Sequence, residues 1–299
     1  YKIEKMNQTA LVIIKSMGIG DLIILLANIH AISKYINNKV VVLAQKNTHA
    51  AEILKYDPHI AEVIDLDKKG FLNIIKKIKP KKFDQSYIYN DSLRLHIISK
   101  LSGINKTFQY DFFSKKGKNF FKTAREFTEK VLNTKIDHES KIFWKKDEII
   151  EVSKKFNISK KTKNIICGIS ASGPTKRWSI ENYIKLFENI NEKFPCKFFI
   201  AAGPKDDHIV EEIMRSSIKD KCISFSKMTI AETIPIIGSC QNYIGNDTGW
   251  AHISAALNLK SLYIFCDSPS EAYGKWRKNI KIVIPKGETI CKHNTLGKD

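Results

Sequence analysis

Short runs of β-branched residues alternate regularly with helical patterns along this chain, and the alternation occurs twice, which limits it to a narrow set of folds. The first series predicts strands at 9–15, 40–44, 63–66 and 83–88, with helices at 22–36, 49–55 and 71–79. The second series predicts strands at 165–169, 197–202, 222–225, 242–245, 261–265 and 280–284, with helices at 180–192, 207–216, 230–237 and 249–257. Such alternation indicates parallel sheets with helices on both faces.

A polar, lysine-rich stretch at 157–163 separates the two series, and the charged segment at 115–155 before it is expected to be helical. We therefore predict an α/β chain with two doubly wound domains, 1–156 and 157–299. At 299 residues the chain is long enough for two separate cores. Sheets of this kind bind ligands at the carboxyl ends of their strands, so we expect a ligand cleft between the domains.

The composition is that of a soluble globular protein, with 43% hydrophobic and 27% charged residues. The longest apolar runs, at 22–27 and 198–202, fall far below the roughly 18 residues needed to span a bilayer. We therefore expect no membrane-crossing segment. The polar N-terminus shows no secretory signal, although Tyr1 cannot be a translation start.

Six cysteines are scattered singly, and most lie in or beside apolar strands rather than in C-x-x-C pairs. They are Cys167, Cys196, Cys222, Cys240, Cys266 and Cys291. This pattern predicts buried, reduced thiols in a cytoplasmic protein and argues against a zinc site or a disulfide framework.

The formal net charge of +19 predicts attraction to a polyanion. Nucleic acid, an anionic membrane face and phosphorylated substrates all fit, and so does a surface of merely solvated lysines. Lysines cluster in three places, at Lys68 and Lys69, at Lys76, Lys77, Lys79, Lys81 and Lys82, and at Lys115, Lys116, Lys118 and Lys122. Charge by itself does not choose among these partners.

The tract 245–256 carries the most chemical information, because a predicted strand passes through Asp247, Thr248 and Gly249 directly into a helix. The first N–H groups of a helix have no internal partner, and the helix dipole adds partial positive charge there. A diphosphate can approach such a turn closely at a glycine. His252 lies one turn into the helix, on the face of Thr248. The simpler alternative is an N-cap by Asp247 or Thr248, with His252 a satisfied core or surface histidine.

Two further loops follow predicted strands. The first contains Gly18, Gly20 and Asp21, with Asp21 expected as the N-cap of a helix beginning at Leu22. Capping alone would explain Asp21, but an ionised carboxylate in a desolvated cleft could also accept a hydroxyl proton.

The second loop spans 170–178 and ends at Ser179, a predicted N-cap. It places Lys176 and Arg177 beside small hydroxyl residues such as Ser172, which suits a departing phosphate. The alternative is a solvent-facing basic turn. Further along, Thr229 and Glu232 form a capping-box pattern that predicts where the next helix begins.

Taken together, the G-x-G-D element, the K-R-W element and the D-T-G-x-x-H-x-x-A-A-L element resemble the family-nine glycosyltransferases, the ADP-heptose:lipopolysaccharide heptosyltransferases and their relatives. The resemblance implies a GT-B architecture, two Rossmann-like domains facing each other across a cleft. It implies that the first domain binds the acceptor and the second a nucleotide-sugar donor.

By this resemblance Asp21 matches the general base and Lys176 the cation on the donor diphosphate. The other residues expected to bind the donor are Ser172, Arg177, Met228, Asp247, Thr248, Gly249 and His252, with Met228 beside the adenine. Asp206 or Asp207 would contact the ribose, and Gly18 and Gly20 would belong to the acceptor-side loop. The chain departs from the family after the strand at 261–265, where 265–270 reads F-C-D-S-P-S in place of a G-P-T-D-P loop.

The resemblance implies a bacterial, inverting, metal-independent transferase that moves heptose from an ADP-heptose-type donor to a lipopolysaccharide core or related glycan. We expect no cofactor and no metal, an anionic glycolipid acceptor, a cytoplasmic location with peripheral contact at the inner membrane face, and no nucleic acid. Two alternatives stay open. One is a related transferase with another nucleotide sugar or a protein acceptor, and the other is a non-catalytic nucleotide-sugar-binding protein of the same fold.

Overall fold

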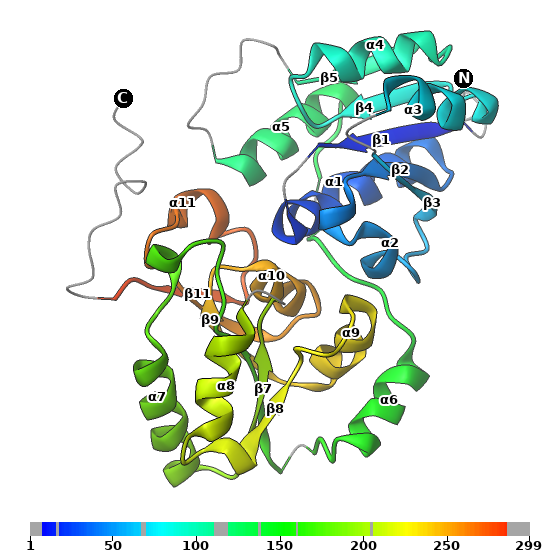
Figure 1. Cartoon of the computed structure of the whole chain (residues 1–299). Helices are drawn as coiled ribbons and strands as arrows, with labels where there is room; N and C mark the ends of the chain where they lie inside the picture. Colours follow the sequence, from blue (N-terminus) through cyan, green and yellow to red (C-terminus); the bar gives the residue numbers. More distant parts are fainter. Residues whose placement is uncertain are drawn as a thin grey trace. The chain divides into compact units, whose positions relative to one another are not determined.

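The computed structural model describes residues 8–15, 18–66, 70–110, 119–136, 139–159, 161–203 and 206–285. The chain divides into two compact units, Tyr1–Phe143 and Trp144–Asp299, each built around one parallel sheet (Figure 1). This division precedes the boundary predicted at residues 156 and 157. The reason is that helix α6 (Lys146–Lys155) packs against α9 (Ile230–Ser239) of the second unit.

The first unit has a five-stranded sheet in the order β3-β2-β1-β4-β5. The strands are β1 (Ala10–Ile14), β2 (Val40–Ala44), β3 (Ile60–Asp65), β4 (Gln85–Ile88) and β5 (Lys106–Gln109). In the central strand, Val12 pairs with Val42 on one side and Tyr87 on the other, and every strand pair is parallel. Both β1 and β2 are buried throughout, as expected for parallel strands covered on both faces.

The helices of this unit are α1 (Ile19–Ile36), α2 (Ala50–Ile53), α3 (Phe71–Ile78), α4 (Leu93–Leu101) and α5 (Phe120–Leu132). Ile74 of α3 and Leu95 and Ile98 of α4 join the core on one face of the sheet. From β1 the chain moves to β2 and β3 on one side of the sheet, and it then returns to β4 and β5 on the other side. Because the crossovers are right-handed in both directions, α1 covers the opposite face, where it packs against α5.

Helix α1 has the length and apolar composition that a membrane crossing needs, but most of it is buried inside the first unit. The Ser140 hydroxyl donates to the carbonyl of Ile24 and accepts from the N–H of Ala27, which fixes a neighbouring segment onto the helix. These contacts explain its apolar surface as that of a core helix.

The second unit has a six-stranded sheet in the order β11-β10-β9-β6-β7-β8, again with every pair parallel. The strands are β6 (Lys163–Gly168), β7 (Cys196–Ala201), β8 (Cys222–Ser224), β9 (Asn242–Asn246), β10 (Lys260–Ile264) and β11 (Ile280–Val283). Helices α7 (Ile180–Lys193) and α8 (Asp207–Arg215) cover one face, and α6 and α9 lie over the other (Figure 1). The remaining helices are α10 (Gly249–Ala256) and the short α11 (Ser270–Tyr273).

The predicted strands and helices of the second unit are all present, and their ends shift by only a few residues. In the first unit α4 and β5 were not predicted. The segment predicted to be helical at 115–155 is, among its described residues, helical only in α5 and α6. The described residues between these helices form neither helix nor strand. The described cysteines, at positions 167, 196, 222, 240 and 266, are all buried thiols, as predicted. Burial raises their pKa where a shift is resolved, to about 12 for Cys222, whereas Cys291 lies outside the described residues.

Candidate functional site

The two loops of the second unit that looked most reactive in sequence flank the point where its strand order reverses. Strands β6 and β9 are neighbours, yet the chain proceeds from β6 toward β7 and from β9 toward β10, on opposite sides. In doubly wound sheets, ligands bind at such a switch point, outside the carboxyl ends of the two strands. The loops at 169–179 and 247–248 lie at this point.

The tract after β9 forms the strand-to-helix turn that the sequence predicted. Thr248 is the N-cap of α10 by position, although its side chain makes no capping bond. The N–H groups of Ala251 and His252 both donate to the Thr248 carbonyl, so the amides of Gly249 and Trp250 are the first-turn donors that a helix cannot satisfy internally. Such a turn is suited to bind an anion.

His252 lies inside the unit rather than on its surface, with 3% of the residue exposed. Its Nε2 atom is 3.2 Å from Oδ1 of Asp247, and its ring stacks on Trp276 and meets the edge of Tyr263. The described residues offer no hydrogen-bond partner to its buried Nδ1 atom. His252 is thus a core residue that holds Asp247, but its unpartnered Nδ1 differs from the fully satisfied histidine of the simpler alternative. Its contact with a ligand stays a prediction.

Asn246 is the residue that joins the two loops, and the sequence reasoning missed it. Its side chain is fully buried and makes four hydrogen bonds. Its amide donates to the carbonyls of Ile169 (2.9 Å) and Ser170 (3.3 Å), and its oxygen accepts from the N–H of Trp178 and the hydroxyl of Tyr183, both at 3.0 Å. Thus Asn246 holds both ends of the basic loop, and a polar residue at the end of a buried strand was the available signal.

Glycines bring β6 and β9 close together beneath the site. A Cβ atom on Gly245 would lie 2.4 Å from the backbone oxygen of Gly168, and a Cβ atom on Gly168 would lie 2.0 Å from the Tyr243 hydroxyl. That hydroxyl donates to the carbonyl of Asn246, so side chains at either glycine would disturb the turn itself.

The basic loop after β6 contains a short 3₁₀ turn, Pro174–Lys176, and then the N-cap Ser179, whose side chain accepts from the N–H of Asn182 as predicted. Lys176 is partly exposed, and none of the described residues forms an ion pair with it. Ser172 is exposed near the start of the loop. These two side chains are therefore available to a ligand.

Arg177 and Asp206, predicted to touch different parts of a donor, contact each other. Their Nη2 and Oδ1 atoms are 2.5 Å apart, and the Asp206 side chain is nearly buried. The neighbouring Asp207 is exposed in the first turn of α8. Of the two candidates for a ribose contact, Asp207 is thus the one whose carboxylate faces solvent.

The order of the loops along the sheet edge is the strongest geometric feature of this unit. Met228, which is partly exposed, follows β8, and Asp206 and Asp207 follow β7. Lys176 follows β6, and Thr248 follows β9. At about 4.8 Å between neighbouring strands, the edge from β8 to β9 covers about 14 Å. The predicted contacts for base, ribose and diphosphate are therefore arranged in that order along one edge.

The loop after β10, where the sequence departs from the family pattern, is tied to the basic loop. Thr175 donates from Oγ1 to Oδ2 of Asp267 at 2.8 Å. This contact restrains the segment next to Lys176.

In the first unit, the helix after β1 begins earlier than predicted. Gly18 is the N-cap of α1, with extended backbone angles, and Gly20 and Asp21 lie in its first turn. The prediction that Asp21 caps a helix beginning at Leu22 is therefore wrong, because the chain becomes helical at Ile19. The partly exposed carboxylate of Asp21 lies in the first turn of α1, at the positive end of the helix dipole. The first two residues of the predicted loop, 16 and 17, lie outside the described residues.

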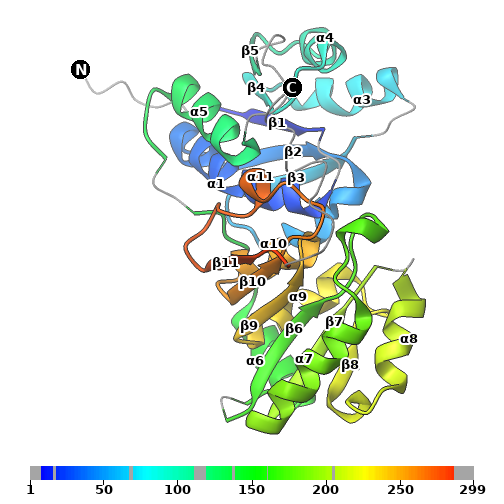
Figure 2. The ribbon, with the colours of Figure 1, turned by 90° about the vertical axis from the view of Figure 1, so that its left-hand side faces the viewer.

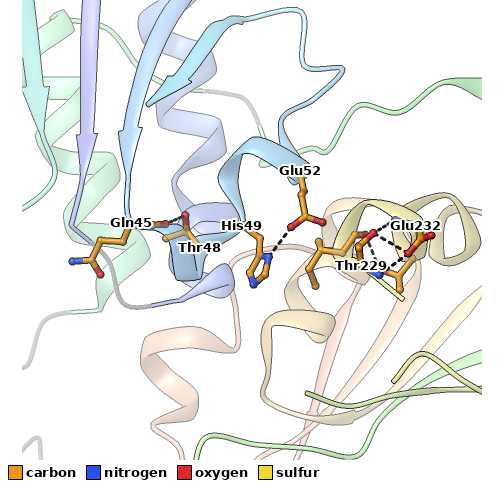
Figure 3. A network of polar contacts seen from close by, with 8 residues as sticks. Gln45, Thr48, His49, Glu52, Thr229 and Glu232 are labelled. Atoms are coloured by element: carbon orange, nitrogen blue, oxygen red, sulfur yellow. Dashed lines mark hydrogen bonds and ion pairs between the residues drawn. The ribbon is translucent and has the colours of Figure 1, made fainter. Parts of the chain in front are cut away.

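Polar residues also follow β2, the strand beside β1. The Thr48 hydroxyl donates to the Gln45 carbonyl, and Nδ1 of His49 lies 2.8 Å from Oε1 of Glu52 (Figure 3). The His49 side chain is 42% exposed. These residues lie at the carboxyl edge that carries Asp21, and sequence reasoning did not select them.

Figure 3 also shows the capping box of α9. The side chain of Thr229 accepts from the N–H of Glu232, whose carboxylate accepts from the N–H of Thr229 at 2.7 Å. This confirms the predicted start of the helix, and it fixes the turn that contains Met228. No cluster of His, Cys, Asp or Glu that could hold a metal ion occurs within the described ranges.

The model of glycosyltransferase family 9 (heptosyltransferase) matches residues 71–297, which is most of the chain. The chain belongs to this family. Among curated members it is 26% identical over 214 residues to lipopolysaccharide heptosyltransferase 1 of Campylobacter coli, a match that covers 66% of this chain and 62% of the relative. It is 35% identical over 98 residues to lipooligosaccharide heptosyltransferase 2 of Haemophilus ducreyi, covering 31% and 27%. The chain thus spans less than two thirds of these relatives' length.

Solved structures of the family have the same fold. A family 9 glycosyltransferase of Veillonella parvula superposes with a TM-score of 0.79 at 16% identity, covering 95% of this chain and 87% of the other. The E. coli ADP-heptose lps heptosyltransferase II superposes with a TM-score of 0.75 at 16% identity, covering 94% and 92%. This family 9 member therefore has the predicted GT-B fold, with two Rossmann-like units (Figure 2).

Proposed function

We propose that this chain is an inverting glycosyltransferase that moves heptose from an ADP-linked donor to a lipopolysaccharide core or related glycan. The observation that carries the proposal is the order of Met228, Asp207, Lys176 and Thr248 along one sheet edge. That order matches base, ribose and diphosphate in an extended nucleotide. Membership of the heptosyltransferase family supports the reaction class. A solved structure with the same fold, an E. coli heptosyltransferase with ADP (TM-score 0.75, 13% identity), supports the nucleotide.

In the proposed reaction Asp21 accepts the proton of an acceptor hydroxyl while that oxygen attacks the anomeric carbon of the donor. The bond from that carbon to the diphosphate oxygen breaks, and the nucleoside diphosphate leaves with the electron pair. Lys176 and the amides of Gly249 and Trp250 stabilise the negative charge that develops on it, which can contribute several kcal/mol. The proposal needs neither metal nor cofactor, since protein cations and amides take the leaving-group charge.

The proposal requires that Asp21 of the first unit and Thr248 of the second contact the same pair of bound substrates. Oriented binding of both substrates is what makes a single carboxylate an effective base. The acceptor is proposed to be an anionic glycolipid, so the enzyme would work at the cytoplasmic face of the inner membrane.

The test has two steps. Among ADP, UDP and GDP, ADP should raise the melting temperature of the protein most, because a ligand that binds only the folded form stabilises it. The variant Asp21→Asn should then lose transfer from ADP-heptose while its affinity for ADP stays near that of the wild type. Asp220→Asn, an exposed carboxylate in the second unit, is the matched control and should keep full turnover. Retained turnover in Asp21→Asn would remove this residue from the mechanism.

One observation favours a second candidate, a family 9 transferase that uses another nucleotide sugar. Asp267 and its bond to Thr175 replace the loop expected after β10, beside the proposed diphosphate site. A larger shift of the melting temperature with UDP or GDP than with ADP would select this alternative. Tight nucleotide binding without turnover on any donor would instead indicate a non-catalytic binding protein.

A further inference from the structure

We infer that α3 and α4 of the first unit form a docking surface for an anionic lipid bilayer. The two helices lie side by side over one face of the five-stranded sheet (Figures 1 and 2). The Arg94 guanidinium lies over the Phe71 ring at 6.0 Å, so the first turns of the two helices are adjacent. The inference builds on the proposed glycolipid acceptor, but lipid binding is measured without any transfer.

The outer side of these helices is unusually apolar. Leu93, Ile97 and Leu101 follow one another at intervals of four residues, so they form one stripe along α4. Their exposed fractions are 60%, 40% and 54%, and that of Leu72 on α3 is 68%. Among the described residues of the first unit, four of the five large exposed hydrophobic side chains lie here. The core is complete without them, since Ile74, Leu95 and Ile98 supply the buried contacts.

Cations surround this stripe. Lys76, Lys77 and Lys79 are exposed at the end of α3, and Arg94 and Lys100 are exposed on α4. Neither helix contains a carboxylate. Within the part of the chain that the structure describes, no residue forms an ion pair with Lys76, Lys77 or Lys79. The two helices therefore carry a net positive charge.

Exposed leucines on helices that carry lysines and no carboxylate fit a lipid surface better than a protein partner. Lysine is depleted at protein–protein interfaces, whereas helices with lysines flanking leucines lie in the boundary between headgroups and acyl chains. Each lysine near an anionic leaflet adds to the binding, and the long side chains can keep their ammonium groups at the headgroups while the leucines enter the apolar layer. Docking here would bring the first unit to the membrane in which a glycolipid acceptor resides.

The experiment is flotation of the full chain with phosphatidylcholine vesicles, with and without phosphatidylglycerol. The wild type should float with anionic vesicles only, and added salt should weaken binding. Lys76→Glu/Lys77→Glu should lower the apparent affinity at least about thirtyfold. The variant Leu93→Ser/Ile97→Ser/Leu101→Ser should also lower it strongly. These side chains are exposed, so the variants should stay folded, although two glutamates in the last turn of α3 oppose the helix dipole. Binding is therefore compared at a temperature where every variant is folded.

Matched controls test whether the effect belongs to this surface. Lys122→Glu/Lys130→Glu changes two exposed lysines on α5, and Ile150→Ser removes an exposed isoleucine on α6. Both should bind vesicles like the wild type. Absence of wild-type binding, equal binding to neutral vesicles, or equal losses in the controls would each overturn the inference. The inference would also be overturned if the wild type is a dimer and the triple variant is a monomer, because a second copy of the chain would then cover the stripe.

Two further readouts separate this inference from the proposed function. The surface variants should transfer sugar to a water-soluble acceptor at the wild-type rate. Loss of vesicle binding in them with unchanged transfer supports the docking surface, whatever the donor proves to be. Failure of transfer in the wild type would count against the proposed function and leave the lipid measurement standing.

Discussion

Removing the Asn246 side chain should destabilise the second unit and weaken nucleotide binding together. The carboxamide links β9 to both ends of the basic loop through four hydrogen bonds, in a position without solvent access. In Asn246→Ala, water cannot readily replace these bonds. The partly buried N–H of Trp178 and the buried carbonyl of Ile169 would lose their partner.

The expected cost follows from these contacts. Leaving a buried polar group unsatisfied costs about 1–3 kcal/mol, and four groups lose a bond here. Because the Tyr183 hydroxyl also lies within 3.3 Å of the Gly168 carbonyl, part of the loss can be recovered. We expect a decrease of about 3–5 kcal/mol in the free energy of unfolding, a large share of the roughly 5–15 kcal/mol typical of a domain.

Urea unfolding, followed by tryptophan fluorescence, measures the change in the free energy of unfolding. Isothermal titration with ADP, at a temperature where the variant is folded, measures the change in nucleotide affinity. Asn189→Ala is the matched control, since Asn189 is exposed on α7 and alanine favours a helix. The reasoning is refuted if Asn246→Ala costs less than about 1 kcal/mol. It is also refuted if the folded variant binds ADP as tightly as the wild type.

The isosteric change Asn246→Asp tests the donor half of the same network. The new carboxyl keeps the acceptor for Trp178 but turns its second oxygen toward the carbonyls of Ile169 and Ser170. Burial and these carbonyls favour the protonated form and raise its pKa above the value of about 3.9 for an unfolded chain. Stability should therefore be greatest below that pH and fall as pH rises toward the folded-state pKa. A variant whose stability relative to the wild type does not change with pH contradicts this.

Three further outcomes are expected. Lys176→Ala should weaken ADP binding about tenfold or more in a calorimetric titration, because a charge-assisted bond to phosphate is lost, and unchanged affinity would exclude the contact. Gly245→Ala should cost about 1–3 kcal/mol in urea unfolding because its Cβ atom would collide with the backbone of Gly168, and a neutral result would refute the close approach. The Thr229 backbone N–H holds the pKa of the Glu232 carboxyl below its usual value. The stabilisation this gives is present above pH 4.5 and is lost as pH falls through the lowered pKa, and Glu232→Gln should remove that part of the pH dependence of unfolding.

Local sequence signals were enough to find most of the second unit. β-Branched runs, the Ser179 cap and the Thr229–Glu232 capping box depend on residues within one turn or strand, and the structure has them where they were expected. Helix α4 was missed because its outward face is apolar at Leu93, Ile97 and Leu101, which hides the usual contrast between a buried and a solvated side.

The chemistry of the loops was also visible in the residue types, since an Asp-Thr-Gly turn into a helix and a Lys-Arg turn after a strand are local features. Their partners were not visible. Asn246 bonds to Trp178 across 68 positions, and Arg177 pairs with Asp206 across 29. A pattern read along the chain contains no information on which distant polar group completes a bond.

The sequence alone therefore established an α/β chain of two doubly wound units and the loops that carry its polar chemistry, because alternation, caps and turns are encoded within a few residues. Packing established the rest: the start of α1 at Ile19, the burial of His252 against Trp276, and the bond between Asp267 and Thr175. The contacts of His252 and Asp267 depend on which strands become neighbours in the folded sheet, because strand order brings distant loops to one edge and decides which side chains meet there.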